Sequence, residues 1–286
     1  MPVINTNVNA SYAQDALKAN ARSMSTAMQQ LSTGSRVNSS KDDAAGLAIG
    51  QTMTSQIRGL NQSVRNVNDG INLLQTAEGA MVQQTDMLQR MRELAVQSAN
   101  ATNSPTQRSY LQKEFSELST QLDKIATQTK WNDKGLLDAT GATSGKFVFQ
   151  AGSLSGQTIQ VQVGSTTLAG LGLANASGTA TVSIGGTTNA SGVTNASSSL
   201  AKIDSALTTI NTARATIGAG INRLTYTADN LNNVASNLAA SRSTIMDTDY
   251  ATASTQLSKT QIIQQAATAM LAQANQQPQS VLSLLK

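Results

Sequence analysis

The sequence predicts a mainly α-helical protein: a long antiparallel helical coiled-coil bundle with paired terminal helices and a small β-rich central region. Three observations indicate this fold. Apolar residues recur at every seventh position in both flanks, an uncharged segment rich in Gly, Ser and Thr separates the flanks, and the 286 residues include only one Trp, four Tyr and three Phe. A strict seven-residue repeat keeps one stripe of a helix facing a partner, so these helices should pack along their length.

The N-terminal flank holds three predicted helices. The first covers the start of the chain, and the second lies within residues 47–99, which contain no proline. The third begins at Ser104, where Pro105 in the first turn and Gln107 complete a capping box. The three apolar seams are Val3, Ala10, Leu17, Met24 and Leu31; Leu60, Val67, Leu74, Met81, Leu88 and Ala95; and Leu111, Phe115, Leu118, Leu122 and Ile125.

The C-terminal flank carries the longest repeat. This pattern alone leaves two interpretations open, because a helix inside a bundle and a seam between separate chains both need such a stripe. The repeat consists of Ile203, Ile210, Ile217, Leu224, Leu231, Leu238 and Ile245.

Small, hydroxyl and acidic residues mark the breaks between helices. Residues 32–35, Ser-Thr-Gly-Ser, should end the first helix, and Ser40, Asp42 and Asp43 supply capping groups for the second. The segment 247–249 is interpreted as a break or cap, because it lacks the further oxygen ligands of a calcium loop.

The middle of the chain differs in composition, since residues 147–201 contain no charged residue. Residues 146–150 and 158–163 alternate with the period of two that half-buried strands show, and the Gly/Ser connection between them suits a hairpin. Beyond Gly164 the composition favours short strands and turns over a lack of order. We expect a β-rich, surface-exposed region over 141–196, in which a short linker could replace residues 164–192.

Composition excludes several kinds of site. The chain has no Cys and no His, which rules out disulfides, the usual zinc sites, thiol nucleophiles and histidine-based triads, so no cofactor and no metal are predicted. The net charge of +4 comes from scattered residues, which disfavours a nucleic-acid surface. No Sec-type signal peptide and no stretch of about 18 apolar residues is present, so we expect no membrane insertion and export by another route.

Several motifs at both ends of the chain resemble those of bacterial flagellins. The N-terminal motifs are SKDDAAG at 40–46, NVNDGI at 66–71 and LQRMRELAVQSAN at 88–100. The C-terminal motifs are DTDYA at 247–251, LAQANQ at 271–276 and VLSLL at 281–285. The similarity covers about residues 1–140 and 197–286 and stops in the middle. One departure is Ser35, where an apolar residue is common in the family.

The resemblance implies a structural subunit, not an enzyme, that polymerises into the flagellar filament for swimming motility and is exported unfolded. Residues 1–42 and 246–286 would be paired filament-core helices, 43–140 and 197–245 the surrounding bundle, and 141–196 the outward-facing variable region. We assign self-assembly to apolar residues of the terminal helices: Val3, Ala10, Leu17, Met24, Leu31, Leu257, Ile263, Met270, Leu271, Val281, Leu282, Leu284 and Leu285.

The resemblance also implies partners and a location outside the cell, in the filament. Besides further copies of the chain, these are the flagellar export apparatus, a flagellin-specific export chaperone, and the filament cap and hook-filament junction proteins. The host Toll-like receptor for flagellin is expected to contact Gln89, Arg90, Leu94 and Glu114 of the free subunit.

Two other classes of protein share some of these features. A hook-filament junction protein has similar terminal helices, and a secreted coiled-coil translocator of a needle-type secretion system also has long helices without cysteine. The motifs at both chain ends favour flagellin over both. A metalloprotease insert of the kind some flagellins carry is excluded, because residues 147–201 contain neither histidine nor an acidic residue.

Overall fold

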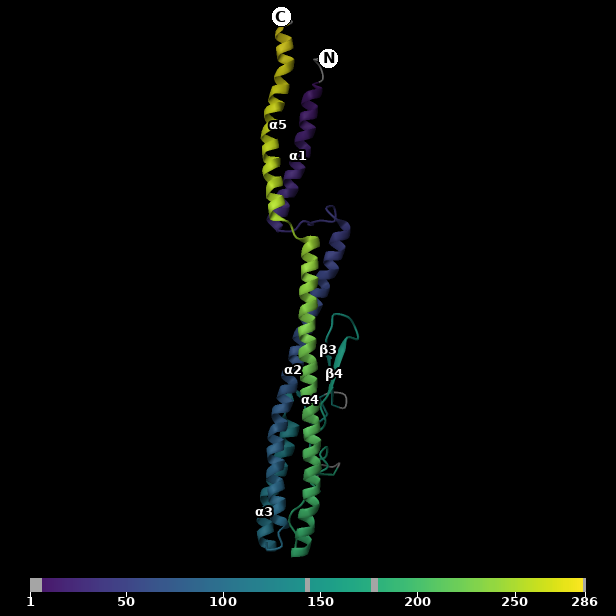
Figure 1. The fold of residues 1–286 in the computed structure, drawn as a ribbon, viewed down its shortest axis with the longest axis vertical. Helices are drawn as coiled ribbons and strands as arrows, with labels where there is room; N and C mark the ends of the chain where they lie inside the picture. Colours follow the sequence, from purple (N-terminus) through teal and green to yellow (C-terminus); the bar gives the residue numbers. More distant parts are fainter. Residues whose placement is uncertain (1–6, 142–144, 176–179, 285–286) are drawn as a thin grey trace. The chain divides into compact units, whose positions relative to one another are not determined.

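The computed structural model describes residues 7–141, 145–175 and 180–284. The helices are α1 (Val8–Thr33), α2 (Ala44–Ala99), α3 (Pro105–Gln128), α4 (Asn189–Met246) and α5 (Tyr250–Leu284). The described strands form two small antiparallel sheets: β1 (Lys130–Trp131) with β2 (Lys134–Gly135), and β3 (Lys146–Gln150) with β4 (Thr158–Gln162) (Figure 1). The mainly helical fold with a small β region is therefore confirmed.

The chain divides into two compact units. The terminal unit comprises residues 1–57 and 236–286, and the central unit comprises residues 58–235. The helix breaks lie at 34–43 and 247–249, where the sequence predicts them. The two units divide at other positions, inside α2 and inside α4.

In the terminal unit, α1 and α5 lie side by side and antiparallel (Figure 1). The least exposed residues of each helix are spaced alternately by three and four, which is the coiled-coil pattern. On α1 these are Ala10, Ala13, Leu17, Asn20, Met24, Ala27 and Leu31, and on α5 they are Ala253, Leu257, Thr260, Gln264, Ala267, Leu271 and Ala274.

The breaks beside these two helices are hydrogen-bonded to each other. Gly34 ends α1 with a φ of 70°, a left-handed conformation that favours glycine. Ser35 and Asp247 form an isolated antiparallel bridge. The backbone N–H of Thr248 donates to the Gly34 carbonyl oxygen at 3.0 Å. Ordering of one break therefore supports the other.

Each break also caps the helix that follows it. Asp43 accepts a hydrogen bond from the Gly46 N–H at 2.8 Å at the start of α2. Asp249 accepts from the Ala251 N–H at 2.9 Å at the start of α5. Both aspartates act as the helix caps that the sequence predicts.

The seams of α2 and α4 form the core of the central unit. All six predicted α2 seam residues, from Leu60 to Ala95, are buried. On α4, the five seam residues from Ile203 to Leu231 are buried, whereas Leu238 and Ile245, which belong to the terminal unit, are half-buried. Within the central unit, the α4 repeat is therefore the stripe of an internal bundle helix, the first of the two open interpretations.

Helix α3 begins with the predicted capping box. The Ser104 hydroxyl accepts from the Gln107 N–H at 3.3 Å, and the Gln107 side chain accepts from the Ser104 N–H at 2.8 Å. Phe115 and Leu122 of its seam are buried. A short hairpin that the sequence analysis missed follows, with a turn of Asn132 and Asp133, both at positive φ, as a two-residue type I′ turn requires.

The hairpin of β3 and β4 matches the predicted strands and packs against helix positions that carry glycine. A Cβ atom at Gly70 of α2 would lie 2.9 Å from Cδ1 of Phe149 in β3. A Cβ at Gly220 of α4 would lie 2.8 Å from Cγ1 of Val161 in β4. Glycine lowers helix propensity by about 1 kcal/mol relative to alanine, and here it allows the hairpin to approach both helices closely.

The rest of the middle region differs from the expectation of a surface-exposed, β-rich segment. Between β4 and α4, the described residues contain no named strand, only an isolated bridge between Ala174 and Ala180. Helix α4 begins at Asn189, well before residue 197. Five apolar side chains of the segment are buried: Leu168, Leu171, Leu173, Val182 and Ile184. The expectation was wrong here because an uncharged segment can still contribute apolar side chains to a core.

Candidate functional site

Two surfaces hold the residues that the sequence assigns to function. The first is the α1–α5 pair of the terminal unit, and the second is the face of α2 that lies beside α3 and α4 in the central unit. Neither surface depends on a cluster of metal ligands, since the described residues contain no group of three or more His, Cys, Asp or Glu side chains that could hold an ion.

The predicted assembly residues divide into two groups on the terminal helices. Ala10 is buried in the α1–α5 seam, and Leu17, Met24, Leu31, Leu257 and Leu271 are half-buried there. Ile263 and Met270 lie outside the seam and are 41% and 66% exposed. Val3 and Leu285 lie outside the described residues, as do the side chains of Val281, Leu282 and Leu284. Pairing within the chain therefore uses one set of apolar residues and leaves another set free.

The exposed apolar set is larger than the sequence analysis predicted. Ile262 is 66% exposed on α5, and Tyr12 and Met28 are 73% and 55% exposed on α1. Ile262 could have been found, because in the adjacent pair Ile262-Ile263 at least one side chain must point away from a helical seam.

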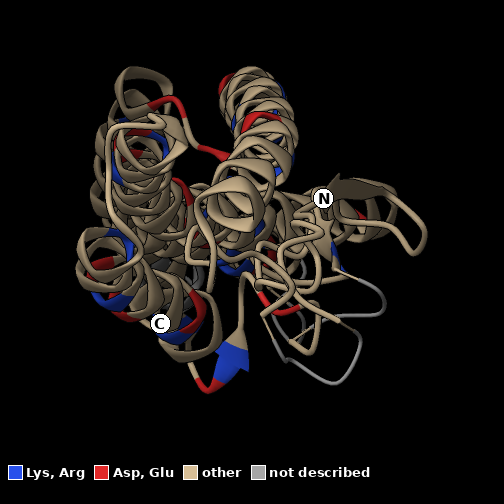
Figure 2. Cartoon of the chain, turned by 90° about the horizontal axis from the view of Figure 1, so that it is seen from below, with Lys and Arg blue, Asp and Glu red and all other residues tan. Residues whose placement is uncertain are grey.

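Helix α5 has almost no charge to keep this surface hydrated. Lys259 is the one charged residue between Tyr250 and Leu285. Figure 2 shows basic and acidic residues interspersed along the drawn helices without a large segment of one sign. No described helix is long and apolar enough to cross a membrane. A helix that exposes Ile262, Ile263 and Met270 with so little charge is suited to burial against another protein surface.

On the second surface, Arg90 of α2 lies between two carboxylates. Its Nη1 donates to Glu93 at 2.9 Å, and its Nε and Nη2 both lie 2.9 Å from Oε1 of Glu114 on α3. The hydrogen bonds that Arg90 donates, first to Glu93 and then to Glu114, raise the pKa of its guanidinium. Arg90 is therefore a charged surface residue paired with two carboxylates, and Gln89 next to it in the chain is also exposed.

Leu94 differs from the other predicted receptor contacts because its side chain is 1% exposed. It packs in the core of the central unit and cannot touch a partner while this packing persists. Arg90 and Glu114 are paired at the surface and Gln89 is exposed next to Arg90 in the chain, whereas Leu94 belongs to the core.

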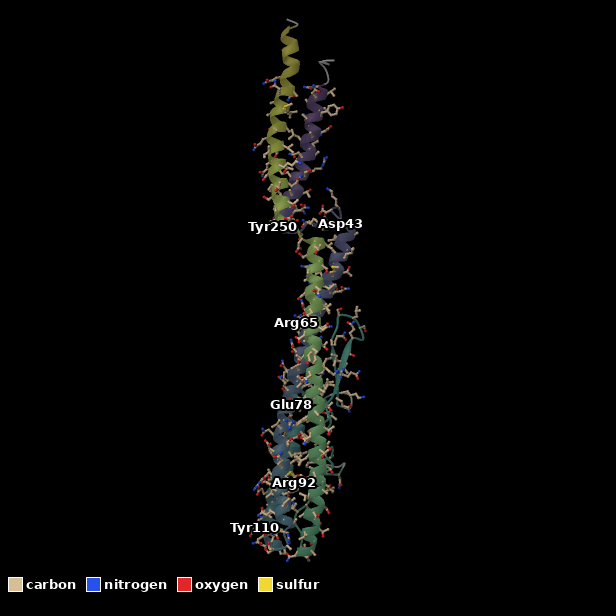
Figure 3. The ribbon with its side chains drawn as sticks, in the orientation of Figure 1. Asp43, Arg65, Glu78, Arg92, Tyr110 and Tyr250 are labelled. Carbon is tan, nitrogen blue, oxygen red and sulfur yellow. The ribbon has the colours of Figure 1, made fainter. Side chains whose placement is uncertain are left out.

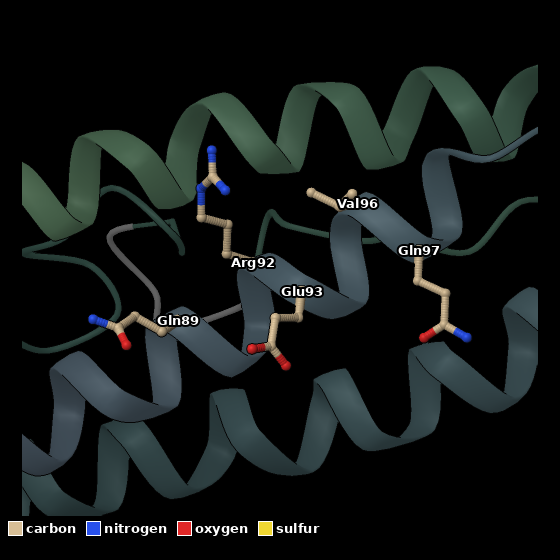
Figure 4. Close-up of a pocket in the computed structure, with 5 residues that line it drawn as sticks. All are labelled: Gln89, Arg92, Glu93, Val96 and Gln97. Atoms are coloured by element: carbon tan, nitrogen blue, oxygen red, sulfur yellow. The ribbon is translucent and has the colours of Figure 1, made fainter.

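An open groove runs beside the same stretch of α2 (Figure 4). It is lined by Gln89, Arg92, Glu93, Val96 and Gln97. The Nε of Arg92 donates to Asp204 of α4 at 2.7 Å, and this hydrogen bond raises the pKa of Arg92. Val96 is 50% exposed. The groove thus combines a fixed ion pair with an exposed apolar side chain, features of a surface that contacts another protein.

Together, the antiparallel terminal helices and the helical bundle define a mainly helical protein whose long helices pack along apolar seams. Two family models match the chain. The bacterial flagellin N-terminal helical region matches residues 4–142, and the bacterial flagellin C-terminal helical region matches residues 200–285.

Relatives agree with these matches. The chain is similar to the flagellin of Halalkalibacterium halodurans, with 42% identity over 284 residues that cover 99% of this chain and 100% of the relative. It is also similar to the flagellar filament 33 kDa core protein of Treponema phagedenis, with 39% identity over 291 residues that cover 99% of this chain and 100% of that protein. The chain belongs to the bacterial flagellin family, and the resemblance seen in its motifs is confirmed.

A solved structure of a putative flagellar hook-associated protein from Vibrio parahaemolyticus is similar in fold. Its TM-score is 0.58 at 14% identity, and the match covers 71% of this chain and 99% of that chain. An identity this low shows the fold alone, so it gives no support to a junction protein over a filament subunit.

Proposed function

We propose that this chain is the structural subunit of a bacterial flagellar filament and that it polymerises through its terminal helices. The observation that carries the proposal is the outer face of α5, where Ile262, Ile263 and Met270 are exposed beside a single charged side chain, Lys259, although the helix already pairs with α1. Burying such side chains stabilises an assembly by about 25 cal/mol per Å² of apolar surface.

The test is a double substitution on this face. Ile263→Asp with Met270→Asp should abolish filament formation, because assembly would then bury two unpaired carboxylates. Gln261→Asp with Thr268→Asp is the matched control: it adds the same charge to the same helix, at exposed polar positions that lie outside the face of Ile263 and Met270. Electron microscopy after a polymerisation step gives the readout. Normal filaments from the Ile263/Met270 variant would contradict the proposal.

The remaining partners follow from membership of the family. An export apparatus, a flagellin-specific export chaperone, and the cap and hook-filament junction proteins would act on the subunit before and during assembly, and the assembled protein would lie outside the cell. Co-purification of a chaperone with the full-length chain, and its loss after removal of residues 250–286, would test the first of these contacts.

Recognition by the host Toll-like receptor for flagellin is proposed for the surface of Gln89, Arg90 and Glu114. Its support is the exposed Arg90 guanidinium, whose planar set of donors is suited to a polar protein interface. Arg90→Ala should lower the potency of the free subunit. The control is Arg65→Ala, which removes an exposed arginine elsewhere on α2 (Figure 3). Equal potency of the two variants would reject this surface.

A further inference from the structure

The α1–α5 seam contains one layer that is polar and buried. Most seam positions on both helices carry Ala, Leu or Met. Asn20 on α1 is 8% exposed and Thr260 on α5 is 2% exposed, and these are the two buried polar residues among the described residues of the terminal unit.

Asn20 and Thr260 lie opposite each other. The Nδ2 of Asn20 donates to the backbone carbonyl oxygen of Thr260 at 2.8 Å. The Thr260 hydroxyl donates to the Leu257 carbonyl oxygen at 2.8 Å, so it is satisfied within α5. Gln264, the next seam residue after Thr260, is also polar and half-buried. The polar side chains of both helices are therefore grouped in one part of the seam.

Two other contacts agree with the register that this layer sets. Asn7 Nδ2 donates to the Ala274 carbonyl oxygen at 2.8 Å near the start of α1. Thr248 N–H donates to the Gly34 carbonyl oxygen at 3.0 Å beyond its end.

The apolar residues alone do not fix this register. Ala, Leu and Met occupy most positions of both seams, so a shift of α5 by seven residues would again place mostly apolar residues opposite apolar residues. After such a shift, Asn20 would face Ala267 or Ala253, and Thr260 would face an apolar layer of α1. A single buried asparagine in a coiled coil is known to specify register at some cost in stability.

We propose that Asn20 sets the register in which α1 pairs with α5 of the same chain. The consequence for assembly rests on the proposed function: a seven-residue slip would move the exposed face of Ile263 and Met270 along the helix axis by about 10 Å. That face would then no longer match a neighbouring subunit.

The absence of cysteine from the chain allows a direct test by disulfide trapping. In the full-length protein, Ala13→Cys with Ala267→Cys reports the observed register, and Ala13→Cys with Ala274→Cys reports a slip of seven residues. Non-reducing gel electrophoresis separates the cross-linked single chain from cross-linked dimers. The parent in this comparison is the double-cysteine protein that retains Asn20: the first cysteine pair should cross-link, and the second pair should give only traces.

Asn20→Leu, and Asn20→Ala as a variant without added bulk, should raise the slipped cross-link about tenfold, the change expected when one buried hydrogen bond no longer selects the register. Met24→Leu is the matched control, because it alters a neighbouring seam residue without touching the polar layer, and it should leave both yields unchanged.

An unchanged slipped cross-link in both Asn20 variants would overturn the proposal, as would equal yields of the two cross-links in the parent. Electron microscopy of the same preparations tests the proposed filament function independently of the register. A parent that cross-links in register but forms no filaments would reject the filament role and leave the role of Asn20 standing.

Discussion

The Nε of Arg108 donates a hydrogen bond to the backbone carbonyl oxygen of Ser98 at 2.9 Å, with the Arg108 side chain fully buried. Its Nη2 donates to the Asn100 carbonyl oxygen at 3.0 Å, and its Nη1 donates to Asn189 at 3.1 Å. One cation on α3 thus satisfies carbonyls at the C-terminal end of α2, where the helix dipole favours positive charge, and reaches the first residue of α4.

Arg108→Met should therefore destabilise the central unit. The variant loses three charge-assisted hydrogen bonds and removes the Arg108 donors from the buried Ser98 carbonyl and the part-buried Asn100 carbonyl, which should lower the free energy of unfolding by about 3 kcal/mol. Thermal unfolding followed by circular dichroism measures the change. Arg65→Met, an exposed control on α2, should stay within about 0.5 kcal/mol of the parent. Similar losses for both variants would show that burial of Arg108 is not the cause.

Two glycines of α4 should respond in opposite ways to alanine. A methyl group added at Gly218 would meet no atom within 4 Å, whereas a Cβ at Gly220 would press on Val161 of the hairpin. Gly218→Ala should stabilise the protein by about 1 kcal/mol through helix propensity. Gly220→Ala should destabilise it by about 1 kcal/mol or more, because overpacking outweighs that gain. Denaturant unfolding of the two variants measures both changes in the free energy of unfolding. If Gly220→Ala stabilised the protein, the hairpin would have to move away from α4 at little energetic cost.

Acid should weaken the start of α5. The Thr252 hydroxyl and then the Ala251 N–H donate to Asp249 and lower its pKa below the ordinary value of 3.8. A carboxyl group whose pKa is lowered by folding contributes stability above its unfolded pKa, and this stability is lost as pH falls through the folded value. Protection against amide hydrogen exchange at residues 250–253, measured relative to the intrinsic rate at each pH, should therefore fall below about pH 4. Asp249→Asn should remove that pH dependence. If the variant responds to acid in the same way as the parent, a group other than Asp249 must cause the response.

Replacement of residues 165–188 by a short Gly/Ser linker should destabilise the central unit rather than be tolerated. Leu173 and Ile184 are fully buried, and Ser98 of α2 donates a hydrogen bond to the Ile184 carbonyl oxygen at 2.6 Å. Loss of several such side chains at about 2 kcal/mol or more each would lower the unfolding temperature markedly. A replacement confined to the exposed hairpin tip at 153–156 is the control and should cost little.

The helical part of the fold could be predicted because its signals are local and periodic. The seven-residue spacing predicts the buried seam of α2, and the capping box of Ser104 and Gln107 predicts the start of α3. The early start of α4 could not be predicted. Most of residues 189–196 are Asn, Ser, Gly or Thr, which favour turns, yet this part of the helix packs against a residue distant in sequence: a Cβ at Gly192 would lie 2.8 Å from Cδ of the buried Arg108.

The candidate surfaces could be predicted in part for the same reason. Spacing identifies which apolar residues lie on a stripe, but it does not say which stripe pairs within the chain. The sequence groups Ile263 and Met270 with Leu257 and Leu271, although the structure places the first two outside the seam. A separation of four residues groups Leu94 with Arg90, although only Arg90 reaches the surface.

The near absence of charge on α5 determines how an assembly built on this helix should respond to solvent. With Lys259 as its one charge before the chain end, ionic strength has few Coulombic contacts to screen, so moderate salt should change association only slightly. Temperature should act more strongly, because burial of apolar surface carries a negative heat-capacity change and weakens on cooling. Sulfate strengthens apolar burial and should therefore promote association through this surface. Chloride at moderate concentration should leave the same association almost unchanged.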